Sequence, residues 1–304
     1  MKRLFILAWA AVVLLAAPLW AAEAEHAGAE VEHGLPANAV RLKSDGVFLT
    51  NSMLVSWVVA LGLILSAQVA TRQIREIPEG AQNFWEWLVE SLHDFLEGII
   101  GADLVKKAFW YFATVFIFIL ASNWAGLIPG VGTIGWGMDG EHGFHVTRPL
   151  FRGVNADLNM TFAMSMIFFV MWVVWAIQSN GVAGFFLHIF GPKGDTTGAL
   201  KVLMIGVFAV VGVLEVMTIA FRPVTLSFRL FGNVFAGENM LESMSNLIRE
   251  PAWLRAAASV VIPIPFYFLE VLVGLVQALV FMLLTSVFTL LICTHDESHE
   301  KAHH

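Results

Sequence analysis

Charged and amide side chains interrupt one long apolar stretch of the sequence, between residues 200 and 247, and their chemistry suits ion movement through a membrane. We single out Glu215, Arg222, Arg229, Asn233 and Glu238. A charge at the centre of a bilayer costs about 2.5–3.5 kcal/mol even on the lenient insertion scale. Several such charges in one segment should therefore face a protein interior or a water-filled path.

Helical spacing places a fixed positive charge between two of the carboxylates. At about 100° per residue, Asn233 lies about 40° from Arg229, on the same face. Glu215 is also about 40° round from Arg229, but roughly 20 Å back along the axis. Glu238 lies on the opposite side, about 13 Å further on. The spacing predicts an ion path that Arg229 interrupts.

A second apolar stretch, residues 254–293, contains Glu270 and Gln277. They are seven residues apart, which puts them on one helix face. If the two stretches form antiparallel helices, Glu270 approaches Glu238 and Gln277 approaches Arg229. Two adjacent carboxylates resist double ionisation, so such a pair suits a proton relay.

A purely structural interpretation is that these groups form buried ion pairs that only fix helix packing. For Arg229 we favour the ion path, because charge inside a membrane is functional by default. For Arg222 we favour the structural interpretation. Its long basic side chain lies beside Pro223, a possible kink, and should extend to the membrane interface.

The composition requires a membrane environment for these elements. The 304 residues are 58% hydrophobic and 13% charged, whereas a soluble domain carries about 25% charged residues. We therefore expect an all-α integral membrane protein. The net charge of −7 argues against nucleic-acid binding, and a single cysteine excludes an intrachain disulfide and a cysteine-based metal cluster.

The first residues are typical of a signal peptide. Lys2 and Arg3 precede an apolar run, and Ala22-Glu23-Ala24 offers a cleavage site. We predict a signal peptide over residues 1–24, with an uncleaved anchor as the alternative. A polar outer-side segment over 25–48 and a single membrane domain over 49–304 should follow.

The membrane domain should contain spans near 49–70, 108–128, 158–177, 200–247 and 254–293. The last two would be roughly 70 and 60 Å long as helices, too long to stand upright in about 30 Å of hydrocarbon. We expect a pair of long, tilted, antiparallel helices joined near 249–251, although each could split into two spans. Pro223, Pro263 and Pro265 mark possible kinks.

The connections set the orientation. Arg72 and Arg75 follow the first span at once, so that end should be cytoplasmic. The N-terminus would then lie outside and the C-terminus in the cytoplasm. Residues 77–105 are amphipathic, which fits either a helix on the membrane surface or one packed on the cytoplasmic loops. Residues 130–157 should form a polar loop on the outer side.

The run from Pro223 to Glu238, with Arg229-Leu-Phe-Gly-Asn233 at its centre, closely resembles the signature of the a subunit of F-type ATP synthases. The resemblance covers nearly the whole mature chain. Weaker similarities support it, and they occur in the segments 123–129, 156–161, 213–215 and 275–278.

The resemblance implies a function and roles for individual residues. The a subunit stays still beside a rotating ring of c subunits and passes protons through two offset half-channels. Arg229 would face the ring carboxylate between them, and Asn233 and Gln277 would orient groups near it. Glu238 and Glu270 map to the outer half-path and Glu215 to the cytoplasmic one. Asn123, Asp157 and Asn159 fall in other family segments and are supporting candidates.

The same resemblance implies the setting of the protein. It would be a non-catalytic subunit, without cofactor or metal, in a bacterial inner membrane. Its partners would be the c-subunit ring, the b-subunit stator stalk, the remainder of the F0F1 complex and the lipid bilayer. Some family members carry histidine at one of the positions matching Glu238 and Glu270, whereas this chain has glutamate at both.

Two other classes of function are weaker alternatives. A membrane-bound oxidoreductase subunit with haem, or an intramembrane protease, needs a histidine within the membrane, and no predicted span contains one. A standalone secondary transporter would show internal repeats. We find no repeat, and the polar residues gather in the last two spans.

Overall fold

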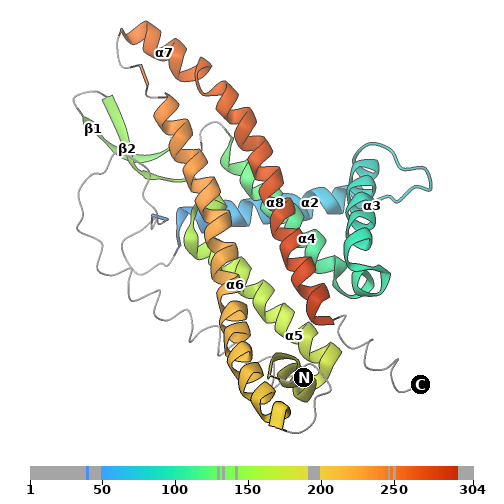
Figure 1. Cartoon of the computed structure of the whole chain (residues 1–304). Helices are drawn as coiled ribbons and strands as arrows, with labels where there is room; N and C mark the ends of the chain where they lie inside the picture. The colour runs from blue at the N-terminus through green and yellow to red at the C-terminus, as the bar shows by residue number, and fades with distance from the viewer. Residues whose placement is uncertain are drawn as a thin grey trace.

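In the computed structural model the chain is almost entirely helical, with one short β-hairpin (Figure 1). The described residues are 39–40, 49–128, 131, 134–140, 143–190, 199–245, 247–248 and 251–293. The predicted signal peptide lies outside these ranges, as does the polar segment 25–48 except for residues 39–40, so both stay predictions.

Within the described residues, five helical segments are long and apolar enough to cross a membrane. Four of the predicted spans each correspond to one helix, and the fifth corresponds to two consecutive helices. The helices are α2 (Asn51–Thr71), α4 (Ala102–Gly126), α5 (Leu158–Phe190), α6 (Ala199–Ser245), α7 (Ala252–Val261) and α8 (Ile264–Cys293). Helix α5 has a kink at Gly181, whose φ of 68° suits a residue without a Cβ.

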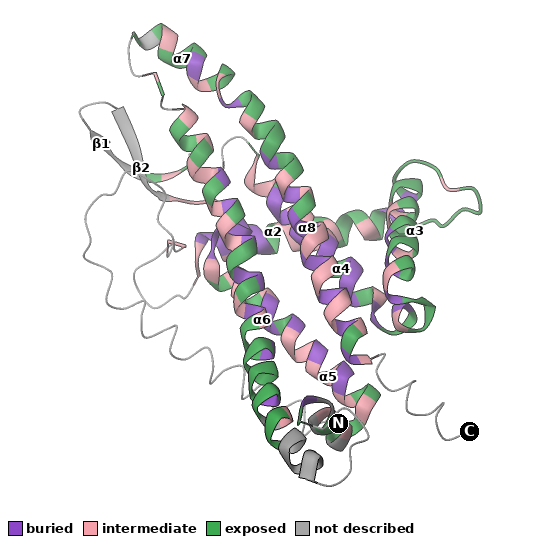
Figure 2. Ribbon diagram, in the orientation of Figure 1, coloured by how far each residue is buried: buried purple, intermediate pink, exposed green. Residues whose placement is uncertain are grey.

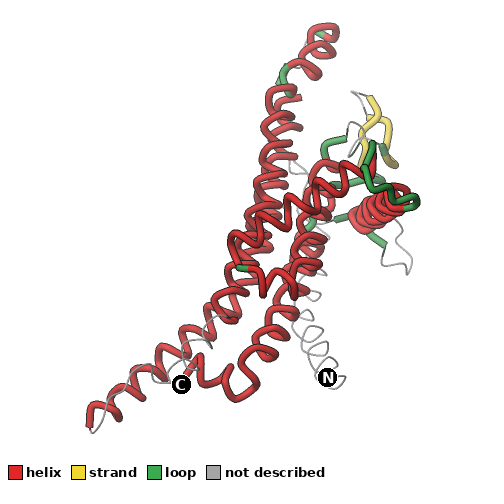
Figure 3. Tube along the Cα trace, turned by 90° about the vertical axis from the view of Figure 1, so that its right-hand side faces the viewer, coloured by secondary structure: helices red, strands yellow, loops and turns green. Residues whose placement is uncertain are grey.

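The two long predicted helices form the antiparallel pair that dominates Figures 1 and 3. Helix α6 is continuous over 47 residues in spite of Pro223 within it. The second stretch is not one helix. It divides at Pro263 into α7 and α8, because proline lacks the N–H donor and clashes with the preceding turn. Helix α6 ends at Ser245 and α7 begins at Ala252, and residues 249 and 250 of the predicted junction lie outside the described residues.

Helix α3 (Ala81–Ile100) corresponds to the amphipathic segment and runs across the direction of α2 in Figure 1. Its apolar face buries Leu92, Leu96 and Ile100 in the core that α3 shares with α4. Phe84 and Trp87 are exposed on the same helix. One side of α3 is therefore packed on the protein, and the exposed aromatic rings suit a membrane surface.

The segment predicted as a polar loop is more ordered than expected. Strands β1 (Gly135–Gly140) and β2 (Gly143–Pro149) pair antiparallel, and the 3-10 turn η1 (Val154–Ala156) follows. Val154 and Asn155 in η1 are fully buried. The prediction of a loop over residues 130–157 missed these elements, because contacts with other helices and not sequence periodicity bring η1 into the bundle.

The core lies where α4 packs along α8 and α5 packs along α6. Phe112, Ile119, Phe168, Phe281 and Met282 are among its most buried side chains. Figure 2 shows buried positions along α4 and α8, whereas the first half of α6 is largely exposed. The apolar residues of that half, including Val210 and Leu214, therefore face outward from the chain.

Candidate ion-translocation site

Arg229 is exposed on α6, while its main chain is held by α8. Gln277 Nε2 donates a 2.8 Å hydrogen bond to the carbonyl oxygen of Arg229. Gln277 Oε1 accepts another, also of 2.8 Å, from Nδ2 of Asn233. The expected approach of Gln277 to Arg229 is confirmed. Because the contact uses the main chain, the Arg229 guanidinium is not engaged by it.

Glu238 on α6 and Glu270 on α8 line the same small cavity, as the antiparallel arrangement predicts. Its volume is about 10 Å³, close to the minimum that holds one water molecule. Ser122 and Asn123 also line it, and the Ser122 hydroxyl has no hydrogen-bond partner within the described part of the chain. Two carboxyl groups beside a water-sized space can pass a proton between them.

Two glycines make room for these carboxylates. A Cβ at Gly237 would overlap the carboxyl group of Glu270, and one at Gly153 would overlap Oε1 of Glu238. The main-chain N–H of Gly153 also donates a hydrogen bond to Glu238. The backbone of the outer loop therefore forms one wall around this glutamate.

Asn123 joins this cavity to the surrounding helices. Its Nδ2 donates to the carbonyl oxygen of Gly274 at 2.9 Å, and its Oδ1 accepts from Asn155 Nδ2 at 2.6 Å. The side chain therefore bridges α4, α8 and η1. Of the three supporting candidates, Asn123 is the one that lines the cavity with Glu238 and Glu270.

Asp157 has a different position and ties the outer ends of two helices together. Its Oδ2 accepts a 2.5 Å hydrogen bond from the Ser52 hydroxyl of α2, and its Oδ1 accepts one from the N–H of Asn159. The second bond satisfies a free N–H at the start of α5, as helix-capping side chains do. Asp157 is thus an anchor, although it also contributes charge near Arg152.

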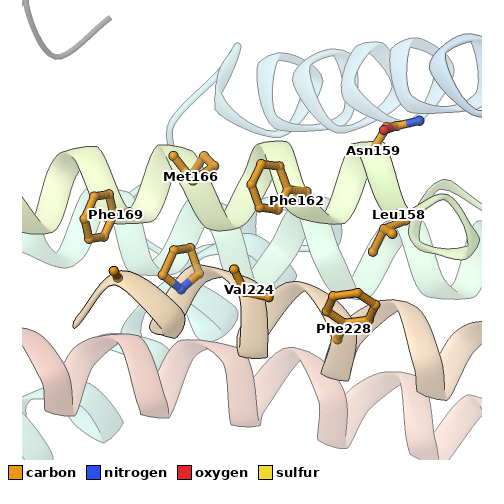
Figure 4. A pocket seen from close by; sticks show the side chains of 9 residues that line it. Leu158, Asn159, Phe162, Met166, Phe169, Val224 and Phe228 are labelled. Atoms are coloured by element: carbon orange, nitrogen blue, oxygen red, sulfur yellow. The ribbon is translucent and has the colours of Figure 1, made fainter. Parts of the chain in front are cut away.

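Asn159 lies apart from the polar cavity. It borders a larger, apolar cavity of about 340 Å³ between α5 and α6. Figure 4 shows its amide pointing away from Phe162 and Phe228, which line that cavity. This cavity offers apolar rings and side chains, so it does not suit an ion.

Arg222 is largely covered by neighbouring helices, whereas the sequence analysis predicted that it extends to the membrane interface. Its side chain is 16% exposed, and its Nη2 lies 3.5 Å from Oε1 of Glu215. The guanidinium also lies over the rings of Trp172 and Phe288. Aromatic faces attract a guanidinium, so α5 and α8 provide favourable contacts for its charge.

Arg152 is a functional candidate that the sequence analysis missed. It follows β2 in the outer segment and is only 4% exposed. Burial lowers the pKa of Arg152, whereas the nearby carboxylates of Glu238 and Asp157 raise it. The available signal was a second arginine, four residues after Arg148, just before a span. The residue spacing in that segment did not predict that the Arg152 side chain is buried.

A separate group on α3 could hold a metal ion. Ligand atoms of His93, Asp94 and Glu97 lie within 4.8 Å of one another. Asp94 and Glu97 are exposed, and exposed acidic groups commonly occur without an ion. This group belongs to α3 and contributes nothing to the charges along α6.

The charged residues therefore form three groups in order along α6: Glu215 with Arg222, then Arg229 with Asn233 and Gln277, then Glu238 with Glu270 and Arg152. A membrane-embedded helical fold with charges ordered along one long helix defines an ion-translocating membrane protein. Residues 53–289 match the family described as ATP synthase A chain. The chain belongs to that family, which is the ion-translocating stator subunit of the F0 sector.

Several curated relatives have a similar length and share about the same identity. ATP synthase subunit a of Gloeobacter violaceus is 29% identical over 249 residues, which cover 82% of this chain and 86% of the relative. Subunit a of Desulfotalea psychrophila is 29% identical over 265 residues, covering 87% and 91%. The sodium ion specific subunit a of Propionigenium modestum is 29% identical over 249 residues, covering 81% and 75%.

Proposed function

We propose that this chain is the non-catalytic subunit that carries protons between the two sides of a bacterial inner membrane and a rotating c-subunit ring. Protons would use an outer half-path through Glu238 and Glu270 and a cytoplasmic half-path through Glu215. The b-subunit stator stalk would hold the chain still. The family membership supports this assembly, and the order of the charges along α6 supports the two paths.

The observation that carries the proposal is the exposure of Arg229 between these two groups of carboxylates. Gln277 engages the main chain of Arg229, which leaves the guanidinium available to a partner. Exposed apolar residues such as Leu214, Phe221 and Phe228 occur on the same helix. A ring of helices packed against them would bring its carboxylate to Arg229. The positive charge would stabilise the deprotonated carboxylate and repel a proton moving straight through.

The orientation follows from the helix ends. Asn51 Nδ2 donates to the carbonyl oxygen of Pro149, and Ser52 contacts Asp157, so the starts of α2 and α5 lie on one side. Basic residues follow α2 or begin α4: Arg72, Arg75, Lys106 and Lys107. By the positive-inside rule those ends are cytoplasmic. Five spans would then place the N-terminus outside and the C-terminus in the cytoplasm.

The decisive test is ATP-driven proton pumping by the assembled complex in inverted membrane vesicles carrying Arg229→Ala. We expect pumping to be abolished, with normal amounts of complex in the membrane. Arg255→Ala is the matched control, because Arg255 is also exposed but lies on α7. Normal pumping by the Arg229 variant would overturn the mechanism.

Sodium is the alternative ion, since the relative from Propionigenium modestum is described as sodium ion specific. The paired glutamates favour protons, because two carboxyl groups beside a water-sized cavity can relay a proton between them. Proton pumping should therefore be unaffected when sodium is removed from the vesicle buffer. Pumping that needs sodium would reassign the transported ion.

A further inference from the structure

Three charged residues of α6 recur at intervals of seven: Glu215, Arg222 and Arg229. Seven residues leave about 20° of rotation and advance about 10.5 Å along a helix, so the three share one stripe. Glu215 and Arg229 are exposed, whereas the side chain of Arg222 is 16% exposed. The middle residue of the stripe is thus the one that the rest of the chain covers.

Side chains of two other helices cover Arg222. Trp172 of α5 and Phe288 of α8 place their ring centroids 5.3 and 4.5 Å from the guanidinium carbon. Trp172 is only 2% exposed, and its Nε1 donates a 3.0 Å hydrogen bond to the carbonyl oxygen of Phe288. The Trp172 ring is therefore fixed against the backbone of α8 at Phe288. The two rings cover the guanidinium.

Glu215 is the partner that this arrangement presents to the guanidinium. Nη2 of Arg222 lies 3.5 Å from Oε1 of Glu215, whose side chain is 47% exposed. From α5 and α8 the groups shown to face Arg222 are aromatic, and the carboxylate comes from α6 itself. A half-exposed carboxylate is thus paired with a cation that two aromatic rings largely cover.

We propose that Arg222 is a positioning residue that holds the carboxylate of Glu215 at one place on the ion path and sets a positive potential there. The proposal rests on the proposed function, in which Glu215 belongs to the cytoplasmic half-path. Proton transfer needs a donor and an acceptor within hydrogen-bond distance. Transfer to an acceptor held in one position is therefore faster than transfer to one that changes position. Arg222 would act through Glu215 and would not touch the ring.

The first test measures the potential directly. The assembled complex first receives Cys293→Ser, which removes the natural thiol of this chain. Glu215→Cys then introduces a single thiol at position 215. Inverted vesicles are treated with anionic or cationic methanethiosulfonate reagents, and the rate of thiol modification is measured. Adding Arg222→Met keeps an apolar side chain between the rings and removes the charge. We expect the ratio of anionic to cationic modification rates to fall about threefold to tenfold, the effect of one nearby charge in hydrated surroundings. With Arg222→Lys, which keeps the positive charge, the ratio of anionic to cationic modification rates should stay close to its value with Arg222.

A thiol at Val211 is the control, since Val211 is exposed one turn before Glu215 and further from Arg222. Its ratio should change less. An unchanged ratio at position 215 in the Arg222→Met variant would overturn the role of Arg222. A thiol at 215 that neither reagent modifies would instead overturn the cytoplasmic path itself, and so the proposed function.

The second test separates positioning from simple helix packing. Rates of ATP-driven pumping are compared for Arg222→Met, Glu215→Gln and the double variant, each normalised to the amount of complex. We expect Arg222→Met to slow pumping severalfold in the natural background and not at all in the Glu215→Gln background. Equal slowing in both backgrounds would identify Arg222 as a packing residue and overturn the inference.

Discussion

Gln277 donates its 2.8 Å hydrogen bond to the main chain of Arg229 and not to its side chain. An additional donor on a helix carbonyl fixes the backbone of α6 against α8 at this point. The guanidinium stays available to an outside partner. The same amide accepts from Asn233, so one side chain positions two residues of the site.

Replacement of Gln277 by leucine should therefore impair transport by displacing Arg229. Loss of one well-formed hydrogen bond costs on the order of 1.4 kcal/mol, which corresponds to about a tenfold lower pumping rate. The rate is measured in inverted vesicles. Gln277→Glu should be similarly slow, because a carboxylate accepts from Asn233 but cannot donate to the carbonyl. A Gln277→Glu variant that pumps at the natural rate would contradict the assigned geometry.

Glu238→Gln should slow proton pumping less severely than Arg229→Ala. The amide cannot carry a proton, but Glu270 remains beside the same cavity. Removal of one proton-transfer group lowers a rate by about 10²-fold or somewhat more, whereas loss of Arg229 removes the separation of the paths. An equal or greater defect in Glu238→Gln would reverse the ranking of these residues.

Gly237→Ala should disturb the outer path through sterics alone. The added methyl group would overlap the Glu270 carboxyl group, and overpacking costs about 1–3 kcal/mol. We expect pumping to fall about tenfold while the charges are unchanged. Gly206→Ala is the matched control, because that glycine is exposed on the same helix with open space around its Cα. Equal pumping by both variants would show that Glu270 can move without consequence.

Arg152→Gln should reduce the amount of assembled complex. Removing one partner from a buried charge group costs about 3–5 kcal/mol, and here it would leave Glu238 and Asp157 without the cation between them. The amount is measured by immunoblot of washed membranes. Adding Asp157→Asn should restore part of the loss, because one buried negative charge is then removed as well. A double variant worse than the single one would argue against electrostatic coupling.

Ser52→Ala should lower stability with little change in transport. The hydroxyl donates to the buried Asp157 carboxylate, and a hydrogen bond to a charged group is worth about 1.5–3 kcal/mol. The thermal midpoint of the purified complex should therefore fall. Ser66→Ala serves as the control, since the exposed Ser66 hydroxyl bonds only within its own helix. Equal midpoints for the two variants would remove Asp157 from its anchoring role.

The sequence by itself determined the class of protein, the helical segments and most of the α6 site. Long apolar runs have one stable form in a bilayer, and charges within them stand out because they are costly. Helical periodicity then placed Arg229 between Glu215 and Glu238. The same arithmetic on the last stretch paired Glu270 with Glu238 and Gln277 with Arg229.

Only the tertiary structure decided how Arg152, Arg222 and Asp157 are used. Each has a position that depends on contacts between segments far apart in the chain: an outer loop against α6, two aromatic rings from α5 and α8, and a serine of α2. Periodicity describes one helix at a time and carries no information about which neighbour covers which face. The tertiary structure also decided that Gln277 binds the backbone of Arg229, and so left its charge exposed.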